Sequence, residues 1–144
     1  MTTVTRMIST RTAHADDVQS VLEFWSQAAM GGERVSDTAA AVASLISRDP
    51  QALLLAVEDE QIIGSLIAGW DGWRCHLYRL AVAPNRRRQG IARILIDAAE
   101  ARFRDLGGTR ADAMVLDDNM LGTQTWAGAG YTQEDDNSRW IKAL

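Results

Sequence analysis

Cysteine is nearly absent from this chain of 144 residues, which contains only Cys75. A single cysteine excludes a disulfide bond within the chain and a zinc site built on several thiolates, and it fits the reducing conditions of the cytoplasm. The two histidines, His14 and His76, are far apart in the sequence and have no cysteine partners. We therefore expect no metal site.

Segments that would cross or pass through a membrane are also missing. The longest mostly apolar stretch covers residues 62–70, whereas a transmembrane helix needs about 20 apolar residues. Residues 1–11 are rich in threonine and interrupted by arginines, so they lack the apolar core of a signal peptide. These absences predict a cytoplasmic protein with no membrane partner.

Several common functional motifs are absent as well. The chain has no Gly-Lys pair for a Walker loop, and Gly128-x-Gly130 is not followed by the third glycine of a dinucleotide-binding fingerprint. It also has no Gly-x-Ser-x-Gly elbow of the kind that α/β hydrolases use. The sequence therefore excludes the usual signatures of these three classes.

Lysine is scarce too, because Lys142 is the only one and the other 14 of the 15 basic residues are arginines. The formal net charge of −4 argues against a nucleic-acid partner, since phosphate backbones require a basic face. Three arginines nevertheless adjoin at 86–88, where a local anion site could form. The length and the 47% hydrophobic content predict one domain over residues 1–144 with its own core.

Hydrophobic periodicity predicts an alternation of short strands and amphipathic helices. The expected strands cover residues 5–12, 53–57, 62–69, 75–82 and 111–116, with one or two closing strands within 131–143. The expected helices cover 13–29 (ended by Gly31-Gly32), 37–47, 89–106 and 119–127. Because three strands follow one another in the middle of the chain, we expect a mixed, largely antiparallel sheet with helices packed on it.

The segment over residues 80–92 is the most informative part of the chain. It places a strand, a turn with Arg86, Arg87 and Arg88, and then Gly90 directly before a helix. The first turn of a helix offers unpaired N–H groups and a partial positive charge, and glycine lets a ligand approach the backbone. This order favours a phosphate site, and a solvated arginine turn is the alternative.

Residues Arg87-Arg88-Gln89-Gly90-Ile91-Ala92 match the Gln/Arg-x-x-Gly-x-Gly/Ala signature, and Asn119 stands eleven residues before Gly130-Tyr131. With the element order, these two landmarks make residues 3–142 resemble the GNAT superfamily of acyl-CoA-dependent N-acyltransferases. The resemblance implies an α/β (α+β) GNAT fold, with a mixed, mostly antiparallel sheet of six to seven strands and about four helices. It also implies acetyl-CoA as the cofactor and frequent homodimers.

The resemblance further implies which residues contact the coenzyme. Strand residues would hold the pantetheine arm through their backbone, namely Leu80, Ala81 and Val82. Backbone N–H groups would cradle the pyrophosphate, namely those of Arg88, Gln89, Gly90, Ile91 and Ala92. Arg86, Arg87 or Arg93 would pair with the adenosine phosphate, and Asn119 would face the pantetheine. A splay between the strands around 78–82 and 112–116 would open this slot.

The same resemblance implies aminolysis of a thioester, with a backbone N–H near Val82 as the oxyanion donor. Many relatives use a tyrosine acid where this chain has Trp126, whose indole is not a useful acid. Tyr131 could replace it only if its hydroxyl points into the cleft, and a core role is the alternative. His76 stands where some relatives carry a glutamate base, with Tyr78 on the same strand face. A surface or hydrogen-bonded histidine is the alternative for His76.

The acceptor site is expected at a loop that carries Trp70, Asp71, Trp73 and Arg74. Aromatic walls with one carboxylate suit a cationic amine, whereas Arg74 suits a substrate that carries a carboxylate. Trp25 is expected either in the core or at the acceptor pocket. The resulting hypothesis is an acetyl-CoA-dependent N-acetyltransferase that acts on a primary amine of a small molecule or peptide by direct attack in a ternary complex. The alternatives are a non-catalytic acyl-CoA-binding or regulatory domain and a protein Nα-acetyltransferase.

Overall fold

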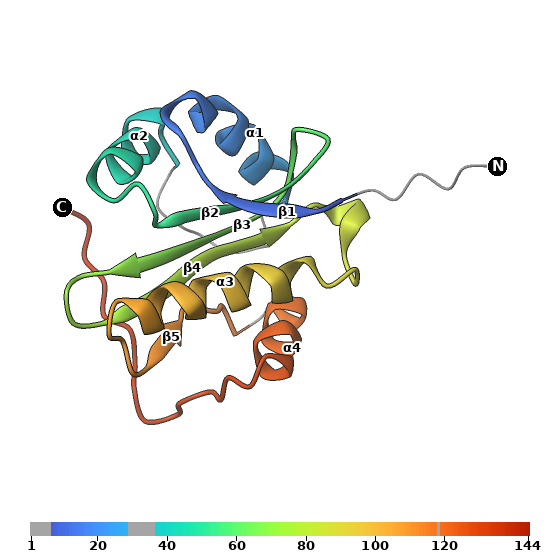
Figure 1. Cartoon of the computed structure of the whole chain (residues 1–144). Coiled ribbons are helices and arrows are strands. Elements are labelled where there is room, and N and C mark those ends of the chain that lie inside the picture. The colour runs from blue at the N-terminus through green and yellow to red at the C-terminus, as the bar shows by residue number, and fades with distance from the viewer. Residues whose placement is uncertain (1–6, 29–36, 118) are drawn as a thin grey trace.

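The computed structural model describes residues 7–28, 37–117 and 119–144, and a five-stranded sheet forms its centre (Figure 1). The strands lie in the order of the chain, and their bounds are Ser9–Thr12 (β1), Leu53–Glu58 (β2), Gln61–Trp70 (β3), Cys75–Val82 (β4) and Ala111–Ala113 (β5). Pairing is antiparallel from β1 to β4, and β5 is parallel to β4. The predicted mixed, mostly antiparallel sheet is confirmed.

Four α-helices cover the two faces of this sheet in the described residues. One face carries α1 (Val18–Ala28) and α2 (Ala39–Arg48), and the other carries α3 (Ile91–Asp105) and α4 (Met120–Gly128) (Figure 1). Short 3-10 turns at Ala15–Asp17 and Pro84–Arg86 stand before α1 and α3. Within the ranges given above, no helix is long and apolar enough to cross a membrane.

The sheet separates two hydrophobic clusters. The first cluster lies on the side of α1 and α2, and α1 contributes its apolar stripe to it. Trp25 is buried there as the stripe predicted, whereas Leu22 is only partly buried and Phe24 takes its place in the core. The predicted end of this helix at Gly31-Gly32 lies outside the described residues, as does Ala29. The first cluster therefore lies between β2, β3 and the α1–α2 pair.

On the opposite face, α3 approaches the sheet closely at Gly64 of β3. A methyl group on Gly64 would lie 2.9 Å from Ile91 Cγ2 and 3.0 Å from Leu95 Cδ1. Both side chains are almost fully buried, and Ile91 is the first residue of α3. Because Gly64 pairs with Val82 at the end of β4, its missing side chain lets the N-terminus of α3 rest beside that strand end.

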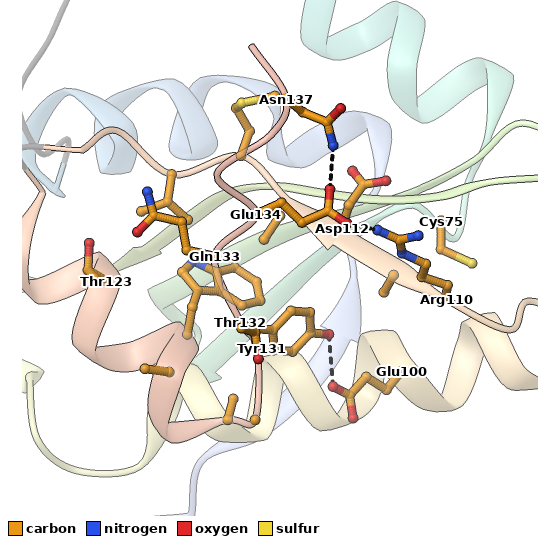
Figure 2. A pocket seen from close by; sticks show the side chains of 18 of the residues that line it. Cys75, Glu100, Arg110, Asp112, Thr123, Tyr131, Thr132, Gln133, Glu134 and Asn137 are labelled. Atoms are coloured by element: carbon orange, nitrogen blue, oxygen red, sulfur yellow. Dashed lines mark hydrogen bonds and ion pairs between the residues drawn. The ribbon is translucent and has the colours of Figure 1, made fainter. Parts of the chain in front are cut away.

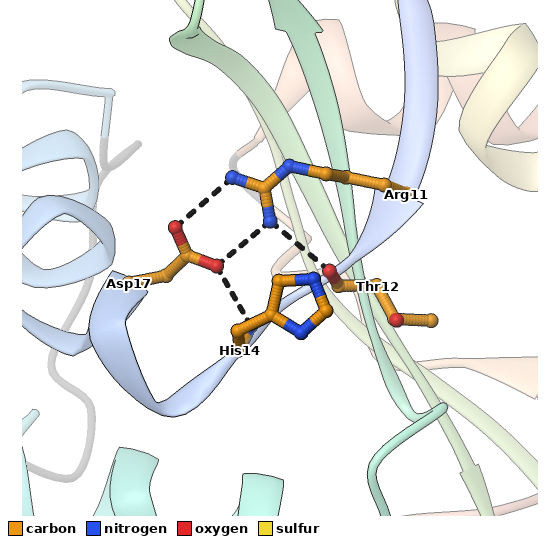
Figure 3. A network of polar contacts seen from close by, with 4 residues as sticks. All are labelled: Arg11, Thr12, His14 and Asp17. Atoms are coloured by element: carbon orange, nitrogen blue, oxygen red, sulfur yellow. Dashed lines mark hydrogen bonds and ion pairs between the residues drawn. The ribbon is translucent and has the colours of Figure 1, made fainter.

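An ion pair fixes the N-terminal strand to the start of α1. Arg11 Nη1 and Nη2 donate to Asp17 Oδ2 and Oδ1 at 2.7 and 3.0 Å (Figure 3). Asp17 Oδ2 also accepts a hydrogen bond from the backbone N–H of His14 at 2.7 Å. The hydrogen bond from Arg11 lowers the pKa of Asp17 to about 2. This contact holds the turn through which the chain passes from β1 into α1.

The sheet is shorter than the sequence pattern predicted at its C-terminal edge. β5 ends at Ala113 rather than at residue 116, and no strand forms within 131–144. Residues 133–137 are all polar, so this segment has no alternating apolar face to bury, and the side chain of Trp140 is 92% exposed. Over the described ranges the sheet therefore has five strands where six to seven were expected.

Candidate functional site

The parallel strands β4 and β5 pair only where both begin. The register runs from Cys75 opposite Ala111 to Leu77 opposite Ala113, and Met114 N donates to Leu77 O at 3.2 Å. From there β4 continues to Val82, while the chain after β5 leaves it and leads to α4 (Figure 1). In the described part of the chain, the two segments thus part beside residues 78–82, where the resemblance places a splay.

A bulge in β4 lies next to this parting. The register between β3 and β4 shifts between Ser65 and Ile67, and Arg79 adopts the left-handed region with φ 58°. Ser65 Oγ donates to Arg79 O at 3.0 Å, and Trp25 Nε1 donates to Ser65 Oγ at 2.8 Å. This chain of hydrogen bonds connects α1 to the bulge. Trp25 is 5% exposed, so it supports the bulge and has little surface that an acceptor could contact.

The bulge also determines which backbone groups of β4 face away from β3. Ala83 N donates to Ile63 O at 2.9 Å, and Ala81 pairs with Ser65. Because backbone groups alternate in direction along a strand, those of Leu80 and Val82 point toward the opposite edge, where β5 has departed. Of the three residues predicted to hold the pantetheine arm, two therefore present their N–H and C=O groups to the splay.

The turn before α3 has the backbone form of an anion site. Arg88 has φ 64° and Gly90 has φ 81°, and left-handed residues in such a turn direct backbone N–H groups into one concavity. Gly90 is the N-cap of α3 and has no side chain to cap the first helical turn, which starts at Ile91. The side chain of Ile91 is buried, so only its backbone can face a ligand.

The structure gives the clustered arginines different environments. Arg86 forms an ion pair with Glu58 of β2, whose side chain is 6% exposed. Arg93 Nη1 donates to Gly128 O at 3.2 Å, and its Nε donates to Asp97 Oδ1, so it connects α3 with α4. Arg88 is exposed on the turn and Arg87 is half-buried. We call the turn that contains Arg88 and Gly90 the anion turn. Arg88 supplies its exposed guanidinium, while the guanidinium of Arg86 is held in the ion pair with Glu58.

Asn119 is the residue predicted to face the pantetheine, and it is the N-cap of α4. Its Oδ1 accepts a hydrogen bond from Gly122 N at 2.9 Å, which satisfies one N–H of the first helical turn. The side-chain oxygen of Asn119 thus caps α4, and its contact with the pantetheine stays a prediction.

His76 lies on β4 between two carboxylates. Its Nδ1 is 3.0 Å from Asp112 Oδ1 on β5, and its Nε2 is 3.6 Å from Asp71 Oδ2 in the loop after β3. Cys75 and Leu77 are buried in the cluster under α3, so His76 between them projects to the α1–α2 side of the sheet. The His76 side chain is 39% exposed, which leaves it accessible from this face.

Tyr78 lies on the same face as His76, as strand alternation predicted. It pairs with Ile67, which belongs to the cluster under α1 and α2. A methyl group on Gly69 would lie 3.4 Å from Tyr78 Cε1, so the ring covers the residue that pairs with His76. Burial, aided by the negative charge of Asp49, raises the pKa of Tyr78. Its hydroxyl therefore stays protonated at neutral pH.

Tyr131 points away from this face. Its hydroxyl donates to Glu100 Oε2 of α3 at 2.8 Å (Figure 2), and its ring meets Trp126 edge to face with centroids 4.9 Å apart. Burial and the hydrogen bond with Glu100 raise the pKa of Tyr131. An acid role was expected only for a hydroxyl in the cleft, and the structure places the hydroxyl against α3 instead. This geometry matches the alternative core role.

The predicted acceptor loop is divided between the two faces of the sheet. Trp70 is the last residue of β3 and packs on the cluster under α3. Asp71 Oδ1 accepts hydrogen bonds from the backbone N–H groups of Arg74 and Trp73 at 2.6 and 2.8 Å, which lower the pKa of Asp71. The guanidinium of Arg74 lies 4.5 Å from the ring centroid of Trp73, which is 75% exposed. Asp71 is thus the loop residue that the structure places against His76, whereas Trp73 and Arg74 contact each other.

A cavity of about 1600 Å³ lies between β5, α3, α4 and the C-terminal segment (Figure 2). An ion pair between Arg110 and Glu134 lines it, and Asn137 Nδ2 donates to Glu134 Oε2 at 2.7 Å. The residues predicted to bind the coenzyme at 80–82 and 87–93 do not line this cavity. Cys75 does, but it is 1% exposed and burial raises the pKa of its thiol. Both properties disfavour a nucleophilic cysteine.

Two residues of this region were missed by sequence reasoning. Ser65 reads as an ordinary strand residue, and its contact with the bulge depends on the pairing of β3 with β4. Asp112 lies in a predicted strand, but only the register of β5 shows that it stands opposite His76. Strand alternation would have given the face of Asp112, and no local signal gives its partner.

Comparison with known proteins identifies relatives of this chain. The family model described as "Acetyltransferase (GNAT) family" matches residues 18–130. An acetyltransferase of Pectobacterium atrosepticum is 31% identical over 104 residues, which cover 72% of this chain and 73% of the relative. The sequence resemblance is thereby supported over most of the chain.

Solved structures show the same fold at lower sequence identity. The PaiA N-acetyltransferase of Thermoplasma acidophilum, in complex with coenzyme A, has a TM-score of 0.79 at 18% identity and covers 91% of this chain and 93% of that one. An aminoglycoside N-acetyltransferase in complex with coenzyme A has a TM-score of 0.78 at 16% identity, with all of both chains covered. These similarities establish the arrangement of the sheet and helices.

Proposed function

The chain belongs to the acetyltransferase (GNAT) family, and from this premise we propose that it transfers an acetyl group from acetyl-CoA to a primary amine of a small molecule. The observation that carries the proposal is the juxtaposition of the β4–β5 splay with the anion turn before α3. A ligand that combines an extended amide-bearing arm with a polyphosphate requires both features side by side. We propose that residues 1–144 act as one domain in this reaction.

The residues around the splay fit coenzyme A. The backbone groups of Leu80 and Val82 would pair with the amides of the pantetheine arm, as an added strand would. The N–H groups around Arg88 and Gly90 would hold the pyrophosphate, and the exposed guanidinium of Arg88 would add a charge-assisted contact. Acetyl-CoA supplies an acyl group that is activated as a thioester. A backbone N–H at Val82 would donate to the acyl oxygen.

The face that carries His76 fits a cationic acceptor. Asp71 and Asp112 give this face two carboxylates on either side of His76. The acceptor nitrogen forms the amide bond as the carbon–sulfur bond of the thioester breaks. His76 takes one proton from the bound ammonium before the attack. The second proton, which the nitrogen loses as the amide forms, goes to the leaving sulfur, so that coenzyme A departs as the thiol. The aminoglycoside N-acetyltransferase of similar fold acts, by its name, on an amine-bearing molecule.

Within the described residues, the two positions considered for an acid do not supply one, since Trp126 occupies the usual tyrosine position and the Tyr131 hydroxyl contacts Glu100. A thiol with a pKa of about 8.5 leaves tolerably without one. Positioned acid–base groups add about 10²–10⁴-fold, and the alignment of the two reactants supplies a further large part of the rate. We therefore expect a slower enzyme rather than an inactive one.

Release of free thiol from acetyl-CoA tests the proposal. Diamines, aminoglycosides, amino acids and peptides are offered as acceptors, and the His76→Gln variant serves as the control. We expect turnover above the buffer rate with at least one cationic amine and a loss of 10²-fold or more in the variant. Turnover that is equal in both proteins would exclude His76 as the base. Failure to bind acetyl-CoA at all would refute the proposal as a whole.

A second candidate function is that of a non-catalytic acyl-CoA-binding domain. It is favoured by the lack of an acid at Trp126 and Tyr131. It predicts clear binding of acetyl-CoA with no thiol release for any acceptor of the panel. Isothermal titration with acetyl-CoA, run beside the thiol assay, separates the two functions.

A further inference from the structure

In the hydrogen bond between His76 and Asp112, only one of the two side chains can be the donor. An ionised carboxylate has no proton to donate, so His76 Nδ1 must donate across the 3.0 Å that separates it from Asp112 Oδ1. The neutral imidazole then carries its only N–H at Nδ1, and Nε2 presents a lone pair. The hydrogen bond that one ring nitrogen makes fixes which nitrogen carries the proton. A histidine without such a hydrogen bond is therefore not held in one tautomer.

The lone pair of Nε2 is directed to the side of Asp71. The 3.6 Å between Nε2 and Asp71 Oδ2 is too long for a direct hydrogen bond. Both atoms accept hydrogen bonds in this tautomer, so a donor with several protons can bridge them. An ammonium group is such a donor, and its positive charge also suits the Asp71 carboxylate.

We propose that Asp112 is a positioning residue that holds His76 with its proton on Nδ1, so that Nε2 receives the proton of a cationic amine bound beside Asp71. This proposal rests on the proposed function. The proton moves from the acceptor ammonium to Nε2, which leaves a neutral amine and an imidazolium between two carboxylates. Asp112 gains a stronger, charge-assisted hydrogen bond in that state.

The backbone holds each member of this group independently of the others. Asp112 stands opposite His76 in the register of β4 and β5, and Asp71 is fixed by the backbone N–H groups of Arg74 and Trp73. Two further polar groups of β4 lie toward α1 and α2, namely the Tyr78 hydroxyl, which stays protonated, and the Arg79 guanidinium, which stacks on Trp25 and forms an ion pair with Asp37. Asp112 is 59% exposed, so its removal leaves no cavity and the variants are expected to fold.

The tautomer of His76 can be measured directly by NMR. The chain has only two histidines, and the His76→Gln spectrum assigns their signals in ¹H–¹⁵N long-range correlations at pH 8. We expect the Nδ1–H form in the wild-type protein and a mixture rich in the Nε2–H form in Asp112→Asn, since the amide can donate to Nδ1. Asp105→Asn at the end of α3 removes the same charge elsewhere and should leave the wild-type form.

Steady-state kinetics of the same variants test whether the reaction uses this tautomer. Because Asp112 is exposed, we expect only part of the effect of the base itself, a fall of about tenfold in kcat for Asp112→Asn. KM for acetyl-CoA should not change, since Asp112 is not among the coenzyme contacts. Asp112→Glu keeps an acceptor-only carboxylate and should recover part of the lost kcat.

Two results would overturn the proposal. The first is the Nε2–H tautomer in the wild-type protein, which would show that Asp112 does not direct the proton. The second is a changed tautomer in Asp112→Asn with an unchanged kcat, which would show that the reaction does not depend on it. A wild-type protein without turnover would instead refute the proposed function, because the NMR measurement is independent of acetyl transfer.

Discussion

The close packing of α3 on Gly64 of β3 gives a sharp test of how packing shapes the anion turn. In Gly64→Ala the new methyl group would lie 2.9 Å from Ile91 Cγ2, 3.0 Å from Leu95 Cδ1 and 3.3 Å from Ala56 Cβ. All three neighbours are at most 1% exposed, so none can turn toward solvent. The methyl group is accommodated only if α3 moves away from β3.

The expected cost follows from this geometry. Adding a methyl group to a well-packed core costs about 1–3 kcal/mol, and two contacts at or below 3.0 Å place Gly64→Ala in the upper part of this range. The displacement falls on Ile91, the first residue of α3. Because the N–H groups of that turn are the proposed pyrophosphate contacts, coenzyme A should also bind more weakly.

Urea denaturation and titration with coenzyme A measure the two effects. Gly128→Ala is a matched control, because a methyl group on Gly128 meets no atom within 4 Å and its φ is not positive. That helical position should gain stability, by up to about 1 kcal/mol. A Gly64→Ala protein as stable as the wild type, with unchanged coenzyme affinity, would refute the packing argument.

Three further variants test individual contacts. Arg86→Met should lower the free energy of unfolding, measured in urea, by about 1–3 kcal/mol, because the carboxylate partner of Arg86 is buried. Arg88→Asn should change stability little and weaken coenzyme A binding about two- to fivefold at low salt. Equal effects of the two substitutions would contradict the assignment of a structural role to Arg86 and a binding role to Arg88. Tyr131→Phe should cost about 1 kcal/mol by loss of one hydrogen bond and leave the pH profile of kcat/KM unchanged, whereas an altered profile would restore a catalytic role. Asp17→Asn should lower the free energy of unfolding by about 1 kcal/mol at pH 7, because Arg11 lowers the pKa of Asp17 to about 2. The stability that this ion pair contributes is complete above the usual carboxyl pKa of 3.8 and is lost as the pH falls through about 2. In urea titrations the two proteins should therefore differ clearly at pH 7 and much less at pH 2.

Much of the architecture follows from local patterns. The apolar runs that start at residues 53, 62 and 75 predict β2, β3 and β4, and these strands form within one or two residues of the expected bounds. The arginine turn with Gly90 predicts a helix start, and Gly90 is indeed the N-cap of α3. Such features depend on a few consecutive residues, so they are visible without knowledge of the fold.

The C-terminal segment shows where local reasoning fails. Residues 131–143 were expected to add one or two closing strands, but strand formation needs a partner edge and an apolar face. The polar residues at 133–137 supply no such face. Whether a segment pairs with a sheet is decided by the whole arrangement rather than by its own propensity.

The sequence by itself determined the kinds of elements, the position of the anion turn and the family, because each depends on neighbouring residues. The tertiary structure alone decided the partners of the side chains. It assigned Arg86 to Glu58, the Tyr131 hydroxyl to Glu100, and His76 to Asp112. Each pair joins residues at least 28 positions apart, and strand register and helix packing, which bring such residues together, arise only when the core forms.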